Sequence, residues 1–497
     1  MGVRLKGVWV VRRWQLCLIV SSVLFVGCGG AATPELQLIE DAAEAMGSLR
    51  AVRETTSLAL EGDGQVYRLG QNERPQAELP YYEITNYSLQ LDYENTRWRL
   101  SQDRTSTYLT GSPLLGARQS YGLDGEVAYD QRGEQMVRAS DQVATDRWAE
   151  MYHNPIGIVL LALDETSTVS NLRDEGGRQA VDIVAGNGTS FTLAVDGATG
   201  LPHSVTSSAA HPNLGDVSVE TVFTGYEEAG GLGGFQARLT LPRAYTTSVD
   251  RYTVSEYLTT TNTNATLDDL AAPAEVQGST PMESVTVEVE EVAEGLWLLG
   301  GQSHHSAVVE FDEFLVLIEA PQSEARTLAV IARAREFQPD KPLRYVVNTH
   351  HHFDHSAGIR AAVSERLTVI THRVNRSFFE DIVSRTHSIV PDALSRSPQP
   401  LTIETVASAE PYELTDGSRV LQLFHVVDDP HAAGMIMAYL PRERVLIEVD
   451  AFSPTSQEFP FAEALLQNIV DRGLRVDTIM PLHGGLSTLE DLEAAVE

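Results

Sequence analysis

The chain has 497 residues, of which 42% are hydrophobic and 21% charged, so it is long enough for two or three folded units and does not have the composition of a disordered chain. Its formal net charge is −33, from 36 Lys and Arg against 69 Asp and Glu. Such an acidic surface repels phosphates, which excludes nucleic acid as a partner. We interpret the charge as a solvated surface suited to a salty or extracytoplasmic setting. A steering field or a cation-rich partner is the alternative.

Residues 1–28 have the features of an export leader. The basic stretch MGVRLKGVWVVRRW precedes the apolar run LCLIVSSVLFV, which is short for a permanent span and has the size of a signal-peptide core. Gly27-Cys28 resembles the lipobox of bacterial lipoproteins, in which the cysteine is lipidated and becomes the mature N-terminus. Cys17, the other cysteine, lies inside the leader, so no internal disulfide is left after processing. We expect Cys28 to anchor the protein by lipid to the outer membrane, facing the periplasm; a plain cleaved signal or an uncleaved anchor is the alternative.

Residues 29–265 are expected to form a mainly antiparallel β domain. Apolar periodicity predicts a first helix over 34–49, and short alternating runs such as SLALEGDGQVYRL and TSFTLAV then predict strands, with one helix over 148–165. The pattern resembles the N-terminal modules of some exported bacterial hydrolases and, more loosely, the half-open barrels of lipoprotein carriers. We expect the many apolar residues to pack as a core, with a lipid-binding groove as the alternative. We assign surface or turn roles to His153, His203 and His211.

Residues 266–282 are polar, carry Pro and Gly, and lack periodicity, so we expect a linker. In residues 283–497, runs such as SAVVEFDEFLVLIEA and RYVVNT predict strands, and SEARTLAVIARARE and SAGIRAAVSE predict helices. This mixture indicates sheets with helices packed outside them.

The segment NTHHHFDHSAG, residues 348–358, concentrates histidines between a predicted buried strand and a predicted helix. A loop at the carboxyl end of a strand is where such folds usually place their chemistry. Imidazole and carboxylate in HxHxDH spacing suit Zn²⁺, and two neighbouring clusters of this kind suit a pair of ions. Four imidazoles gathered at a strand end have little structural reason without metal.

This motif resembles that of the metallo-β-lactamase-fold hydrolase superfamily. The resemblance covers about residues 285–497 and implies an αββα sandwich, two β-sheets between helices, preceded here by the β domain. It implies one metal held by His350, His352 and His431, a second held by Asp354, His355 and His483, and Asp450 bridging them. His425 is a rival to His431, and His351 is expected to face solvent or to support the ligands. We expect packing or turn roles for His304, His305 and His372, with support of the ligands or contact with the substrate as the alternatives.

The function implied is an exported, membrane-anchored dinuclear zinc hydrolase, with other divalent metals as alternatives. A hydroxide shared by the ions would attack a small ester, lactone, thioester or amide, with Asp354 as the catalytic residue that orients it or passes a proton. Asp450 stands where the superfamily's lactamases commonly carry Cys or Ser, so β-lactamase activity is the alternative reaction. A lipid-anchored carrier or binding protein with an auxiliary metal domain is the alternative of a different class. Because all seven ligands follow residue 282, we expect a fragment starting near Met282 to keep its metals alone.

Overall fold

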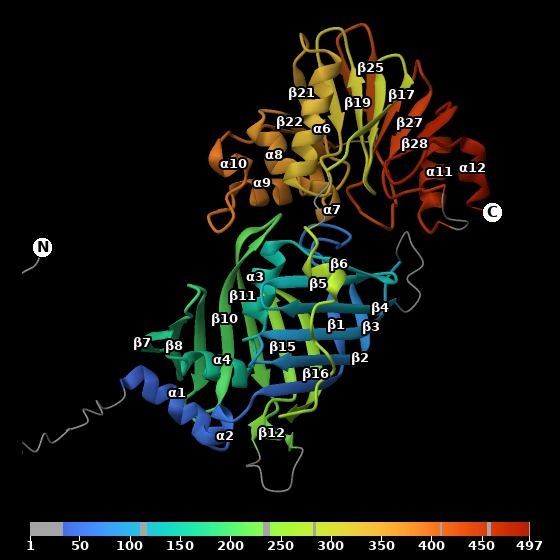
Figure 1. Ribbon diagram of the computed structural model, residues 1–497. Helices are drawn as coiled ribbons and strands as arrows, with labels where there is room; N and C mark the ends of the chain where they lie inside the picture. The colour runs from blue at the N-terminus through green and yellow to red at the C-terminus, as the bar shows by residue number, and fades with distance from the viewer. Residues whose placement is uncertain are drawn as a thin grey trace, which may run out of the picture.

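The computed structural model describes residues 33–109, 117–231, 239–281, 285–407, 410–454 and 459–496. The predicted leader and its Cys28 lie outside the described residues. Figure 1 shows two β-rich halves joined end to end, with helix α7 of the second half facing the first. Within the described ranges, no helix is both long and apolar enough to cross a membrane.

The N-terminal half is built on one large sheet. Thirteen strands pair in the order β6-β5-β4-β3-β2-β1-β16-β15-β11-β10-β9-β8-β7, each antiparallel to its neighbours, and the short β13 pairs with β16. This confirms the mainly antiparallel domain. The strands are β1 (Ser57–Tyr67), β2 (Tyr81–Asp92), β3 (Arg97–Ser106), β4 (Ala117–Asp124), β5 (Val127–Arg132), β6 (Gln135–Arg138), β7 (Thr168–Asp174), β8 (Arg178–Val184), β9 (Ser190–Asp196), β10 (Pro202–His211), β11 (Gly215–Thr224), β13 (Gly230–Gly231), β15 (Ala244–Val249) and β16 (Tyr252–Thr263), with β12 (Glu227–Glu228) and β14 (Thr240–Leu241) as a separate pair.

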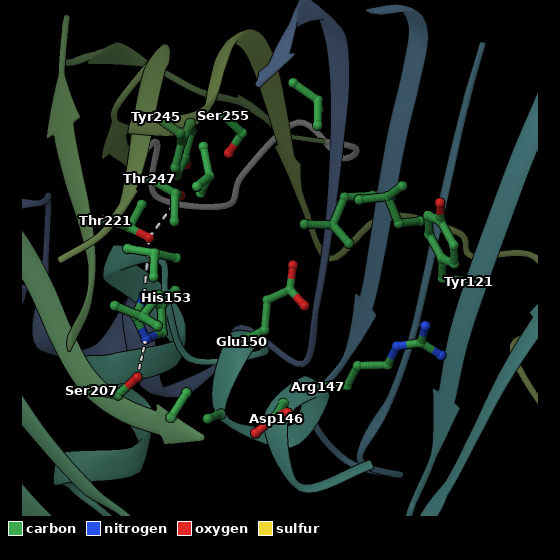
Figure 2. A pocket seen from close by; sticks show the side chains of 18 of the residues that line it. Tyr121, Asp146, Arg147, Glu150, His153, Ser207, Thr221, Tyr245, Thr247 and Ser255 are labelled. Atoms are coloured by element: carbon green, nitrogen blue, oxygen red, sulfur yellow. Dashed lines mark hydrogen bonds between the residues drawn. The ribbon is translucent and has the colours of Figure 1, made fainter. Parts of the chain in front are cut away.

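Four helices accompany this sheet: α1 (Pro34–Ala45), α2 (Leu49–Arg53), α3 (Asp141–Glu150) and α4 (Pro155–Ala162). The single helix predicted over 148–165 is wrong, because the chain breaks between α3 and α4. Asn154 is extended there, and its side chain accepts a hydrogen bond from the backbone N–H of Gly157 at 2.8 Å, which starts a new helix with Pro155 in its first turn. Because the chain breaks here, α3 is separate from α4 and lies across the inner face of the sheet (Figure 2).

The C-terminal half is the predicted αββα sandwich. One sheet contains β17 (Glu288–Ala293), β18 (Leu296–Gly300), β19 (Ser306–Glu310), β20 (Leu315–Ile318), β21 (Leu343–Val347), β22 (Thr368–His372) and β23 (Ile403–Val406) in sequence order. The other contains β24 (Tyr412–Thr415), β25 (Val420–His425), β26 (Ile436–Leu440), β27 (Val445–Glu448) and β28 (Thr478–Pro481). The helical segments are α6 (Glu324–Phe337), α7 (Phe353–Ser356), α8 (Ile359–Ser364), η1 (Arg373–Asn375), α9 (Arg376–Ser384), α10 (Ala393–Arg396), α11 (Ala462–Asp471) and α12 (Leu489–Ala494).

Three apolar layers hold the sandwich together. The inner faces of the two sheets meet through residues such as Val309, Ile318, Leu423 and Ile447, all almost fully buried. Separate clusters lie between the first sheet and α6, α8 and α9, and between the second sheet and α11 and α12. Both sheets are thereby covered, which explains strands that are apolar without alternation, such as β20 and β27.

The segment expected as a linker, 266–282, is partly folded. It contains α5 (Ala274–Gln277), and its Ala272 and Val276 are buried against Tyr129 of β5. The two halves also meet directly: the Asp216 carboxylate accepts hydrogen bonds from the backbone N–H groups of Ser388 and Ile389. The connection between the halves is therefore a packed surface as well as a stretch of chain.

Candidate metal centre

The histidine-rich motif begins directly after the buried parallel strand β21. The side chain of Asn348 donates to the backbone carbonyl of His355 at 2.8 Å, and Glu319 accepts from the backbone N–H of Thr349 at 2.7 Å. Both bonds are buried, so they fix the path of the loop without water. The loop passes into the single turn α7, which contains Asp354 and His355.

Three histidines and one aspartate form a first cluster. The ligand atoms of His350, His352, His431 and Asp450 all lie within 4.8 Å of one another. Oδ2 of Asp450 is 3.3 Å from Nε2 of His350 and 3.1 Å from Nε2 of His431. Asp450 follows β27 with a φ of +56°, a conformation costly for a non-glycine residue and frequent at functional sites.

A second cluster contains His304, His355 and His483. Here too Asp450 is close, with Oδ2 at 2.9 Å from Nε2 of His355 and Oδ1 at 2.8 Å from Nε2 of His483. One carboxylate therefore contacts histidines of both clusters.

Asp354 belongs to neither cluster by distance. Its Oδ2 is 3.9 Å from Nε2 of His355, and it accepts hydrogen bonds from Nε2 of His304 at 3.3 Å and from the side chain of Gln71 at 2.8 Å. His304, for which a role in supporting the ligands was one of the alternatives from the sequence, lies beside Asp354. No sequence pattern links the two, because 50 residues separate them.

Hydrogen bonds outside the clusters decide which nitrogen of each histidine is free. His352 Nε2 donates to the carbonyl of Asn72 at 3.0 Å, His355 Nδ1 to the carboxylate of Glu319 at 2.9 Å, and His483 Nδ1 to a backbone carbonyl at 3.1 Å. The other nitrogen of each ring is then the one that could offer a lone pair to an ion. Such outer partners are what orient metal-binding imidazoles.

The donor set fits divalent zinc. The buried atoms His350 Nε2, His352 Nδ1 and His431 Nε2 make no hydrogen bond, which is unusual for buried polar atoms unless an ion takes their lone pairs. Burial lowers the pKa of His350 to about 3, which keeps that imidazole neutral and able to ligate. For Asp450, burial acts to raise the pKa, but His355, His483 and His431 hold it well below its usual range.

A loop from the N-terminal half covers the candidate metal centre. This closing loop, residues 68–80 between β1 and β2, supplies Gln71 to Asp354 and the Asn72 carbonyl to His352. Gly70 has a φ of +76°, and an added Cβ there would lie 2.2 Å from the ring of Phe353, so only glycine fits the approach. Its carbonyl accepts from the backbone N–H of Phe353 at 3.2 Å. Sequence reasoning missed this loop entirely.

The remaining histidines take other roles. His425 stacks on His372 with ring centroids 4.1 Å apart and lies outside both clusters. His351, expected near solvent or in a supporting role, is 1% exposed and contacts the Asn72 side chain at 3.3 Å. His305 lies beside the clusters without joining them. Of the histidines expected at surfaces or in turns, His153 lies in the turn between α3 and α4, and its two nitrogens bond Thr221 and Ser207 inside the N-terminal half (Figure 2).

Comparison with known proteins found similar structures and one family. Solved structures similar to part of this chain include the metallo-beta-lactamase from Pontibacter korlensis (16% identity, covering 42% of this chain and 97% of that one, TM-score 0.34) and FIM-1 from Pseudomonas aeruginosa in its mono-zinc form (18%, 43% and 95%, 0.35). DIM-1 metallo-beta-lactamase matches at 17% identity over 42% of this chain and 94% of that one, with a TM-score of 0.34. No curated protein matches. Residues 299–459 match the metallo-beta-lactamase superfamily, and this chain therefore contains a domain of that superfamily behind a large antiparallel sheet.

Proposed function

We propose that this protein is a dinuclear zinc hydrolase of small esters, lactones, thioesters or amides. The observation that carries the proposal is the position of Asp450, whose two oxygens lie 2.8 to 3.3 Å from four histidines drawn from both clusters. A single carboxylate placed in this way suits two cations that share it. It has no comparable structural use, because the His350 and His431 nitrogens that face it make no hydrogen bond.

Each residue then has a stated task. His350, His352 and His431 would hold one zinc ion, and His355 and His483 the other, with Asp450 between them. The resemblance adds Asp354 to the second set, although its carboxylate lies outside the cluster of ligand atoms, 3.9 Å from His355. When bound, the ions supply Lewis acidity and lower the pKa of water toward about 7.

Asp354 is the residue placed for proton transfer. Its side chain is 41% exposed, whereas that of His355 is 1% exposed, so a substrate can reach its carboxylate. Gln71 holds one oxygen and His304 the other, which fixes the direction of the group. In this position Asp354 can take a proton from the attacking water and return it to the leaving group.

The preference for esters and lactones over β-lactams is a proposal based on residue type. An aspartate at position 450 resembles the superfamily's thioesterases, lactonases and phosphodiesterases, whereas its lactamases commonly carry Cys or Ser there. The test is a panel of aryl esters, lactones, thioesters, penicillins and carbapenems with zinc-loaded protein of residues 29–497. We expect turnover of an ester or lactone and at most weak β-lactam turnover. A kcat/KM for a β-lactam far above that for every ester and lactone would overturn the assignment of reaction class.

We also propose that the protein is held at the outer membrane by a lipid on Cys28, facing the periplasm. The support is the sequence Gly27-Cys28 after a basic and apolar leader. Cells given labelled fatty acid should incorporate it into the wild-type protein but not into a Cys28→Ala variant. Absence of label in the wild type would refute the anchor.

A further inference from the structure

A cavity of about 980 Å³ lies inside the N-terminal half, apart from the metal centre. Its walls are formed by helix α3 and by strands of the large sheet, among them β1 to β4, β10, β11, β15 and β16. Figure 2 shows Glu150 of α3 pointing into the space between them. The volume is at the upper end of the range for small-molecule sites. A packed core of the kind expected from the sequence would leave no such space.

The floor of the cavity is apolar. Leu60, Ile84, Leu89 and Leu100 line it together with Tyr87 and Tyr257, whose rings stack with centroids 4.1 Å apart. These side chains come from β1, β2, β3 and β16, which are adjacent in the sheet, so the apolar surface is continuous. Such a surface favours a ligand with an aliphatic chain.

Two arginines in the wall have no acidic partner among the residues that the structure describes. The guanidinium groups of Arg68 and Arg104 lie 5.5 and 4.8 Å from the ring centre of Tyr82. Arg68 donates only to the Tyr82 hydroxyl at 3.3 Å, and Arg104 makes no side-chain hydrogen bond to any described residue. In a chain with 69 acidic and 36 basic residues, two half-buried cations without an acid beside them indicate a site for an anion.

We propose that this cavity binds an anionic amphiphile, a long-chain carboxylate, with its chain on the apolar floor and its head group between Arg68 and Arg104. The acids in the wall, Asp146 and Glu150, both belong to α3, whereas Arg68 and Arg104 belong to the start of the closing loop and to β3. A third arginine in the wall, Arg147 of α3, is paired with Asp130. Burial raises the pKa of both acids, which weakens their repulsion of an anion.

The head-group end of the cavity adjoins the metal half. Leu69, next to Arg68, also lines the cavity, and Ile389 from the other half completes the wall there. Two residues further along the chain, Gln71 contacts Asp354. The binding site is therefore close in sequence and space to the proposed catalytic centre, but the proposal does not depend on hydrolysis.

The experiment is a fluorescence titration of the zinc-loaded chain, residues 29–497, with a dansyl-labelled undecanoic acid, followed by displacement with oleate and with oleyl alcohol below their aggregation concentrations. We expect saturable enhancement that both compounds reverse. The double variant Arg68→Gln, Arg104→Gln should weaken oleate by about tenfold or more while the alcohol changes by less than about twofold, because only the charged head loses a partner.

Matched variants separate the cavity from the surface. Arg118→Gln on β4, exposed and paired with Asp103, should bind oleate as the wild type does. Leu89→Trp, which fills the floor, should abolish displacement by both compounds, with far-UV circular dichroism and zinc content reporting that the chain is folded. Absence of saturable binding, or equal binding by folded Leu89→Trp, would overturn the cavity site. An equal loss of oleate and alcohol in the double arginine variant would overturn the head-group assignment.

Discussion

The backbone carbonyl of Asn72 lies 3.0 Å from Nε2 of His352, so the N-terminal sheet orients a candidate ligand of the metal half. Across the same boundary Gln71 holds Asp354 at 2.8 Å. Residues of both halves therefore form one site.

Replacing Gln71 with Ala should weaken zinc binding by about 10-fold to 100-fold, the usual cost of losing an outer partner of a ligand. The reason is that Asp354 would keep only His304 as a hydrogen-bond donor. Competition with a chromophoric zinc chelator measures the change. Gln76→Ala in the same loop is the control, since Gln76 bonds the exposed Ser377 instead of a ligand. Equal affinities for wild type and Gln71→Ala would show that the contact is incidental.

A fragment of residues 283–497 should bind zinc less tightly than the whole chain. The sequence alone led us to expect that it would keep its metals by itself, but the fragment lacks both the Asn72 carbonyl and the Gln71 amide. Elemental analysis after dialysis, compared between the fragment and the chain of residues 29–497, measures the difference. If the fragment retained two ions, the expectation from the sequence alone, that it keeps its metals by itself, would be correct.

Replacing Asp450 with Asn should reduce zinc content from two ions per chain to one or fewer. The amide keeps the shape of the side chain but removes the charge that faces histidines of both clusters. Ester turnover should fall by more than about 100-fold, because a direct ligand matters at least as much as an outer one. Asp471→Asn, at the exposed end of α11, should leave both quantities unchanged. If the Asp450→Asn protein still held two ions, Asp450 would not be needed to bridge them.

Acid should destabilise the N-terminal half through His153. Burial lowers the pKa of His153 to about 4 from an ordinary 6.5, so the unfolded chain binds its proton more readily than the folded one. This residue's contribution to stability is complete above pH 6.5 and is lost as the pH falls from 6.5 to about 4, a change of at most about 3 kcal/mol. Thermal unfolding of wild type and His153→Gln across that range should give a smaller pH dependence for the variant. Parallel curves would show that His153 does not titrate with unfolding.

The parts of the site that sequence could reveal are those with local spacing. His350, His352, Asp354 and His355 fall within six residues after an apolar strand, a pattern set by the ligand requirements of the site. His304 and Gln71 have no such signature. Gln71 meets Asp354 across 283 residues, and only the docking of two folded halves brings them together.

The same distinction applies to the fold. Alternation in runs such as TSFTLAV predicts strands because one face is buried, and those strands formed in the structure. Alternation does not report the curvature of the sheet, so the sequence could not decide between a packed core and the groove that we gave as the alternative, and it could not place the cavity under α3. The partners of His153, Thr221 and Ser207, could not be predicted for a related reason: they come from β11 and β10, far along the chain.

Gly70 allows the closing loop to reach Phe353, and this contact between the two halves decides at which stage of folding zinc can bind tightly. The loop can orient His352 only after strands β1 and β2 have formed and the second half has folded, because the contact joins residues 280 apart. Contacts so distant in sequence form late. During refolding, uptake of zinc at full affinity should therefore follow the recovery of β structure. The rate of this uptake would measure how fast the two halves dock.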